Sequence, residues 1–169
     1  MKKLYTLLFI AFAFITNAQI VNIPDANFKA KLLSANASNQ VTSMEIPIPD
    51  SIYNTWTVSS YHTIDINGDG EIQVSEAQAI KWLKVNVSGI SSLTGIEAFT
   101  NLIYLDCSSN QLTVLDVTQN TQLQMLYCFG NQLTTLDVTQ NSQLQELRCD
   151  SNQLTTLDVT QNTQLQVLG

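Results

Sequence analysis

The feature that most constrains this chain is a tandem repeat of constant length in its second half. Three units follow one another in register, at 102–122, 123–143 and 144–164, and a partial unit occupies 165–169. A unit this short cannot bury its own apolar side chains, so successive units have to stack on one another. The sequence therefore predicts a solenoid in which each unit forms one coil.

Each unit carries the apolar frame of a leucine-rich repeat. The first unit begins L-I-Y-L-D-C-S-S-N-Q-L, which matches the frame L-x-x-L-x-[L/C]-x-x-N-x-L. A related frame, L-x-x-L-D-V-x-x-N, fills the rest of the unit. Because so short a unit leaves no room for a helix on the convex side, we expect a mainly β solenoid with short parallel strands.

A degenerate copy of the frame precedes the regular units. Residues 80–101 keep apolar residues at matching spacing and are predicted to form a divergent first repeat, so the leucine-rich repeats span 80–169. Residues 19–79 then form a small N-terminal cap of helix and loops. Within it, residues 23–33 predict a short helix with Phe28 and Leu32 on one face. We expect this helix to cover the open first edge of the solenoid.

Cysteine and asparagine recur at fixed positions of the units. Cys107, Cys128 and Cys149 lie one repeat period apart at the same inward position, so their side chains should point the same way and form a buried ladder of thiols. A disulfide or metal role is the less favoured alternative. Two rows of asparagine are predicted to hydrogen-bond backbone groups where the chain turns: Asn110, Asn131 and Asn152, and Asn120, Asn141 and Asn162.

Residues 65–76 read D-I-N-G-D-G-E-I-Q-V-S-E and match the calcium loop of an EF-hand at each ligand position. A complete EF-hand has a helix on both sides, but residues 61–64 are β-prone, so we expect a structural calcium site rather than a switch. The alternative is a turn rich in Asp and Asn that holds no metal. The predicted ligands are Asp65, Asn67, Asp69, Glu71 through its backbone carbonyl, Gln73 and Glu76.

Residues 1–18 have the pattern of a secretory signal peptide. Lys2 and Lys3 precede an apolar run at 4–15, and Ala18 suits cleavage before Gln19. The run is shorter than the roughly 20 residues of a membrane-spanning helix. We therefore expect a secreted or cell-surface protein without a transmembrane segment in the mature chain. Without residues 1–18 the chain keeps 5 basic and 14 acidic residues, a formal charge of −9 that disfavours nucleic acid as a partner.

The pair of related frames within each unit resembles that of secreted bacterial leucine-rich repeat proteins. The segments I-P-D-A-N-F-K-A and L-T-G-I-E-A-F also resemble segments of such proteins. In such proteins the residues that flank each strand form a concave binding face. Here the second halves of the units are nearly identical, whereas the flanking positions of the first halves vary and include aromatic residues and Arg, which are enriched at interfaces. The predicted binding face consists of Tyr104, Asp106, Met125, Tyr127, Phe129, Glu146, Arg148 and Asp150.

These observations together predict a secreted or cell-surface module of the adhesion type that binds a protein or a glycan on its concave face. One alternative is a structural spacer or stalk without a ligand of its own. Another is a fragment of a larger secreted protein that continues with further repeats and a C-terminal sorting domain. An enzyme is not expected, because the single histidine, His62, has no partner residues at catalytic or metal-binding spacing.

Overall fold

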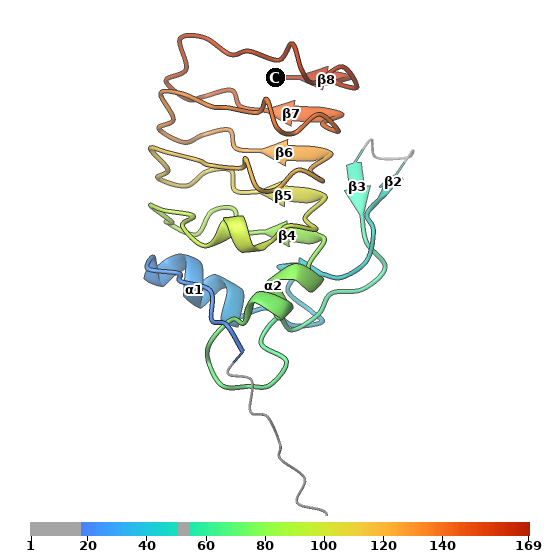
Figure 1. Ribbon diagram of the computed structural model, residues 1–169, viewed down its shortest axis with the longest axis vertical. Helices are drawn as coiled ribbons and strands as arrows, with labels where there is room; N and C mark the ends of the chain where they lie inside the picture. Colours follow the sequence, from blue (N-terminus) through green and yellow to red (C-terminus); the bar gives the residue numbers. More distant parts are fainter. Residues whose placement is uncertain (1–17, 51–54) are drawn as a thin grey trace, which may run out of the picture.

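The computed structural model describes residues 18–50 and 55–169, so the predicted signal peptide lies outside the described residues except for Ala18. One coil of chain stacks on the next, and each contributes one strand to a six-stranded sheet of order β1-β4-β5-β6-β7-β8 (Figure 1). The parallel strands are β4 (Trp82–Lys84), β5 (Tyr104–Asp106), β6 (Met125–Tyr127), β7 (Glu146–Arg148) and β8 (Val167–Leu168).

The strands pair in register, one repeat unit apart. Leu83 lies opposite Leu105, Leu105 opposite Leu126, and Leu126 opposite Leu147. These four side chains point into the solenoid and have no solvent exposure, while the residues on either side of them point to the concave face. The predicted fold class, a leucine-rich repeat solenoid with short parallel strands, is therefore confirmed.

The interior of the solenoid contains the cysteine ladder that the sequence predicts. Cys107, Cys128 and Cys149 are all free thiols and all buried. Burial raises the pKa of each thiol above its ordinary value, most strongly for Cys107 and Cys128. The cysteines therefore act as small apolar side chains between the leucines of neighbouring coils.

The first row of asparagines joins the coils at one corner, as Asn131 illustrates. Its Oδ1 accepts a hydrogen bond from the backbone N–H of Leu112 at 3.0 Å. Its Nδ2 donates to the carbonyl oxygen of Cys107 at 3.1 Å, in the preceding coil, and to that of Cys128 at 3.0 Å, in its own coil. One buried side chain thus satisfies a backbone donor and two acceptors.

The second row of asparagines makes fewer bonds. Asn141 donates from Nδ2 to the carbonyl oxygens of Val117 at 3.0 Å and Asn120 at 2.9 Å. Its Oδ1 is buried and has no hydrogen-bond partner among the described residues. The two rows are consequently unequal, although the sequence alone presents them as equivalent.

The cap covers the first edge of the solenoid. Helix α1 (Ala26–Leu33) lies against the first coil, and its residues Phe28 and Leu32 are completely buried in the same apolar core as the repeats (Figure 1). Strand β1 (Thr42–Ser43) pairs antiparallel with β4 and satisfies the hydrogen-bonding groups of the sheet edge. The cap therefore continues both the core and the sheet of the solenoid.

Asp25 connects the cap helix to the first coil. Its Oδ1 accepts the backbone N–H of Phe28 at 2.9 Å and so caps α1. Its Oδ2 accepts hydrogen bonds from the N–H and Oγ of Ser91 and from the N–H of Ser92, at 2.7 to 3.0 Å. Burial of the carboxylate raises its pKa, but the donors of Phe28, Ser91 and Ser92 outweigh this effect and lower the pKa to about 2.

The cap also contains a β-hairpin and a second helix. Strands β2 (Ile48–Asp50) and β3 (Thr55–Thr57) form an antiparallel hairpin that stands beside the stack of parallel strands (Figure 1). Helix α2 (Val74–Ala79) begins within the predicted calcium loop and contacts a short 3-10 helix, η1 (Ile96–Ala98), which belongs to the first coil. The hairpin brings part of the cap to the concave face.

Candidate binding groove and calcium loop

The concave face of the sheet consists of two rows of side chains that run across the strands. Register places Trp82, Tyr104, Met125 and Glu146 in one row, and Lys84, Asp106, Tyr127 and Arg148 in the other. Neighbours in a row are one strand apart, about 4.8 Å, which is close enough for their side chains to touch. Residues far apart in the sequence therefore form one continuous surface.

Aromatic rings and a guanidinium follow one another along this surface. The rings of Trp82 and Tyr104 stack with centroids 3.7 Å apart and an interplanar angle of 5°. Tyr127 meets Tyr104 edge to face, with centroids 5.3 Å apart and an angle of 75°. The Cζ of Arg148 lies 5.2 Å from the centroid of the Tyr127 ring, within the range of a cation–π interaction. These contacts hold the four side chains in a fixed order from β4 to β7.

The charges of the concave face are partly paired with one another. Both Nε and Nη2 of Arg148 lie 2.6 Å from Oε1 of Glu146, and the hydrogen bond to this carboxylate raises the pKa of Arg148. Burial, and next the charge of Glu146, raise the pKa of Tyr127 above its usual range. Asp106 accepts hydrogen bonds from the N–H and Oγ of Ser108 at 3.1 and 2.6 Å. Both carboxylates are thus engaged within the protein.

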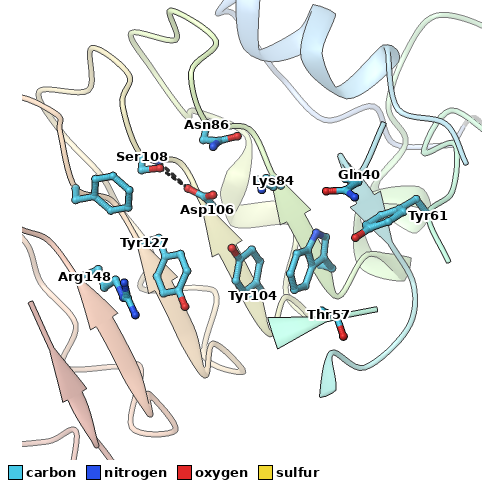
Figure 2. Close-up of a pocket in the computed structure, with 12 residues that line it drawn as sticks. Gln40, Thr57, Tyr61, Lys84, Asn86, Tyr104, Asp106, Ser108, Tyr127 and Arg148 are labelled. Carbon is cyan, nitrogen blue, oxygen red and sulfur yellow. Dashed lines mark hydrogen bonds between the residues drawn. The ribbon is translucent and has the colours of Figure 1, made fainter. Parts of the chain in front are cut away.

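A groove of about 460 Å³ lies between this surface and the cap. The sheet side includes Tyr104, Tyr127 and Arg148, and cap residues line the end of the groove next to Lys84 (Figure 2). The cap residues are Gln40, Thr57 and Tyr61, and the further sheet residues are Trp82, Lys84, Asn86, Asp106, Ser108 and Phe129. The contribution of the cap was not predicted from the sequence. Trp82 and Lys84 could have been predicted, because they occupy the positions of the divergent repeat that correspond to Tyr104 and Asp106 in the next unit.

The predicted binding-face residues differ widely in their exposure. Asp150 is exposed, and Tyr127, Phe129 and Arg148 are partly exposed. Tyr104 and Asp106 are only 5% exposed but line the groove, whereas Glu146 is 7% exposed and lies behind Arg148 in the ion pair.

Met125 requires a correction, because it has no solvent exposure at all. It packs in a small apolar cluster with Trp82 and Tyr104, against which Val58 and Tyr61 of the cap also pack. The large aromatic rings and the cap together cover the thioether. Met125 therefore supports the groove from below and does not present a contact surface.

The predicted calcium loop has a fixed backbone shape that its own side chains maintain. The carboxylate of Asp65 accepts the N–H of Gly68 at 2.8 Å and that of Gly70 at 3.0 Å. Gly70 has φ +79°, a left-handed conformation that glycine adopts without steric cost. Glu76 accepts the N–H of Ile66 at 2.8 Å and that of Gln73 at 2.9 Å, one on each carboxylate oxygen. The two ends of the loop are thereby joined.

The other predicted ligands also supply oxygen atoms. Asp69 accepts the N–H of Glu71 at 2.8 Å, and this bond lowers the pKa of Asp69. The side chain of Glu71 pairs with Lys29 at 2.6 Å, and only its backbone carbonyl is a predicted ligand. Carboxylate, amide and carbonyl oxygens are the donors that calcium prefers. Nevertheless, the described residues contain no group of three or more His, Cys, Asp or Glu side chains in a metal-binding arrangement, so calcium binding stays a prediction.

No protein-family model and no curated protein matches the sequence. The functional domain of InlJ from Listeria monocytogenes, described as including a cysteine ladder, matches with a TM-score of 0.65 and 32% identity, over 90% of this chain and 28% of that chain. The internalin InlF from the same organism matches with a TM-score of 0.68 and 19% identity, over 92% and 39%. A leucine-rich repeat protein from Leptospira interrogans matches with a TM-score of 0.53 and 29% identity, over 55% and 26%.

These comparisons agree with the fold. The protein is a leucine-rich repeat solenoid similar to those of bacterial internalins. It spans between 26% and 39% of the length of the three matched chains. Within the described part of the chain, no helix has the length and apolar character needed to cross a membrane.

Proposed function

We propose that the protein is an exported binding module that holds a protein ligand against its concave face. The observation that carries the proposal is the groove over strands β4 to β7, where Tyr104, Tyr127 and Arg148 follow one another on successive strands. Tyrosine and arginine are frequent at the energetic centres of protein interfaces. The similarity of the fold to those of bacterial internalins supports a binding role at a general level.

A protein ligand is favoured over a glycan by the arrangement of the rings. Sugar recognition commonly uses an exposed aromatic face, but Trp82 and Tyr104 stack face to face and are only 4% and 5% exposed. Tyr127 offers a partly exposed ring that is T-shaped relative to Tyr104. The groove combines the partly exposed rings of Tyr61, Tyr127 and Phe129 with charged and hydrogen-bonding groups, a mixture that suits a polypeptide.

A selection experiment tests the binding role against that of a spacer. A library of displayed random peptides is selected on the protein, and the enriched clones are compared on two variants. One is Tyr127→Ala with Arg148→Ala in the groove, and the matched control is Thr135→Ala with Thr156→Ala at exposed positions away from it. We expect enriched clones to lose about tenfold or more of their affinity on the groove variant only, as for interface hot spots. A spacer predicts clones that bind all three proteins equally, provided that circular dichroism shows both variants folded.

Export is a second part of the proposal and rests on residues 1–18. The full chain, produced in a bacterium with a general secretion pathway, should be recovered outside the cytoplasm with Gln19 as its first residue. N-terminal sequencing of the recovered protein measures this directly. Recovery of the intact chain beginning at Met1 from the cytoplasm would contradict the proposal.

A structural calcium site in residues 65–76 is the third part. The oxygen donors of the loop and the left-handed Gly70 support it, and binding would neutralise carboxylates next to the core of the cap. A ligand at a hundredfold excess over its dissociation constant stabilises the bound state by about 2.7 kcal/mol. Calcium should therefore raise the unfolding temperature of the chelator-treated protein.

The loop variants can be chosen so that they preserve the backbone. Asp69→Asn keeps an oxygen acceptor for the N–H of Glu71 but removes a charge, and Asp150→Asn is the matched control on the exposed surface. We expect the calcium-dependent rise to shrink for Asp69→Asn and to persist for Asp150→Asn. The test uses about 10 mM calcium, which exceeds the roughly 10⁻⁴–10⁻³ M dissociation constants of extracellular calcium modules. If the unfolding temperature does not change at this concentration, the loop is a turn that holds no metal.

A further inference from the structure

The groove has a charge distribution unlike that of the protein as a whole. After residue 18 the chain carries 14 acidic residues and only 5 basic ones, yet Lys84 and Arg148 both line the groove. Asp106 is the one carboxylate among the described lining residues; it is 5% exposed and bound to Ser108. The side chain of Arg148 is 42% exposed, and Lys84 is partly exposed. The exposed charges of the groove lining are therefore positive, and that of Arg148 is already paired with Glu146.

The groove also contains a hydrogen-bond donor without a partner. The Nε1 of Trp82 is buried and makes no hydrogen bond with any of the described residues. A buried N–H without an acceptor is unfavourable, and buried polar groups in proteins are normally paired. Lys84 and Arg148 are thus the exposed donor groups of the groove, and the Nε1 of Trp82 is a further, buried donor.

Apolar surface adjoins the two cations. Tyr127 and Phe129 from the solenoid and Tyr61 from the cap are each partly exposed and line the same groove. Figure 2 shows Tyr61 and Tyr127 on opposite sides of Tyr104, with Arg148 beyond Tyr127. The volume of about 460 Å³ is within the roughly 300–1,000 Å³ range of small-ligand sites, so it admits one large side chain and its neighbours.

We propose that this groove binds an acidic segment of a partner protein in which two carboxylates flank an apolar or aromatic side chain. The apolar side chain lies between Tyr61 of the cap and Tyr127 of the solenoid, and the carboxylates pair with Lys84 and Arg148. The proposal rests on the proposed function, because it specifies the chemistry of that protein ligand. It also makes the cap part of the recognition site.

The spacing of the two cations specifies the ligand further. Lys84 and Arg148 occupy corresponding positions of β4 and β7, three strand intervals apart, which is roughly 14 Å along the sheet. An extended peptide advances about 3.3 Å per residue. A segment that lies across the strands therefore reaches both cations with carboxylates about four residues apart.

Defined peptides test this directly by fluorescence polarisation with the protein. The probe is a short, terminally blocked peptide of glycine and serine that carries one tyrosine between two aspartates at this spacing. Matched probes replace the aspartates by asparagine, the aspartates by lysine, or the tyrosine by glycine. We expect the aspartate–tyrosine probe to bind most tightly, and its affinity to decrease as salt concentration rises.

Protein variants locate the binding and separate local from overall charge. Lys84→Glu should weaken binding of the aspartate–tyrosine probe by about tenfold or more and improve binding of the lysine probe. The new carboxylate repels the aspartates of the first probe and attracts the lysines of the second. Lys31→Glu makes the same change of charge on α1, outside the groove lining, and should alter affinity by less than about twofold. Arg148→Gln, which avoids placing a second carboxylate beside Glu146, should weaken the same probe. Circular dichroism confirms that each variant is folded.

Several outcomes would overturn the proposal. It fails if the asparagine probe binds as tightly as the aspartate probe, if Lys31→Glu weakens binding as much as Lys84→Glu, or if none of the peptides binds. It also fails if a carboxylated oligosaccharide such as oligogalacturonate binds in a Lys84-dependent manner and the peptides do not. The peptide selection separates a failure of this inference from a failure of the proposed function. Groove-dependent clones that are neutral or basic would refute this inference and leave the proposed function intact. An absence of groove-dependent clones would refute the proposed function itself.

Discussion

The two rows of asparagine lead to a quantitative prediction about stability. Asn131→Ala and Asn141→Ala remove the same side chain from the same repeat unit, and both positions are buried, at 8% and 0% exposure. From the sequence alone the two positions look equivalent, because each asparagine is the last residue of an L-x-x-L-x-x-x-x-N frame. The structure predicts unequal costs, because only the Asn131 side chain satisfies a backbone N–H.

The magnitudes follow from the bonds that each substitution breaks. Without Asn131, the N–H of the fully buried Leu112 loses its partner, at about 1–3 kcal/mol, and two carbonyl contacts are lost. Those carbonyls, of Cys107 and Cys128, still accept from Asn110 and Asn152 respectively, so their losses are small. We expect a total of about 3 kcal/mol for Asn131→Ala.

The corresponding total for Asn141→Ala is smaller. Its two acceptors, the carbonyls of Val117 and Asn120, keep the backbone N–H donors of Asn120 and Leu123. The substitution also removes an Oδ1 that has no partner in the described structure. The expected cost is about 1 kcal/mol.

Urea unfolding followed by far-ultraviolet circular dichroism measures both free energies of unfolding. The comparison requires that the dependence on urea concentration has the same slope in both variants, so that the midpoints report stability. A cost for Asn141→Ala equal to or greater than that for Asn131→Ala would refute the reasoning. That result would mean that the Oδ1 of the second row is in fact satisfied, for example by ordered water, and that the rows contribute equally.

Three further predictions concern the core, the cap and the thiols. Leu126→Ala, at a position without solvent exposure, should lower the free energy of unfolding by about 2–5 kcal/mol in the same urea assay, and a cost below about 1 kcal/mol would contradict the assigned core. Asp25→Ala should cost about 1–2 kcal/mol at neutral pH. Because the folded-state pKa of Asp25 is lowered to about 2, this difference should be full above about pH 4 and shrink as the pH falls toward 2, and a difference independent of pH would be inconsistent with the bonds to Ser91 and Ser92. Iodoacetamide at about pH 8 should alkylate the cysteines only after unfolding, because burial raises their pKa; rapid labelling of the native protein, detected by mass spectrometry, would disprove the buried ladder.

Much of the scaffold could be predicted because the residues that specify each coil are close together in the sequence and recur at a constant period. The apolar frame defines which side chains face inward, and the constant period aligns them in adjacent coils, as the buried row from Leu83 to Leu147 shows. The thiol ladder follows from the same reasoning. The cap helix follows from Asp25 and the spacing of Phe28 and Leu32.

The groove could be predicted only in part, because it depends on contacts between distant segments. Nothing in the sequence near Tyr61 indicates that the cap packs over the concave face. Without that contact, Met125 reads as an exposed strand residue, although Trp82, Tyr104 and the cap bury it. The calcium loop is the opposite case: its ligand pattern is entirely local, and only a measurement with the metal tests it.

The in-register stacking of like residues has a consequence for how such a protein can change over time. Asparagine stacks on asparagine, cysteine on cysteine and leucine on leucine, so the interface below a coil resembles the interface above it. A duplicated unit could enter the stack without requiring a new interface. Its insertion between β6 and β7 would move Arg148 away from Tyr127 by about 4.8 Å and leave the core unchanged. Gain or loss of whole units is therefore a route by which the spacing of recognition groups can evolve independently of stability.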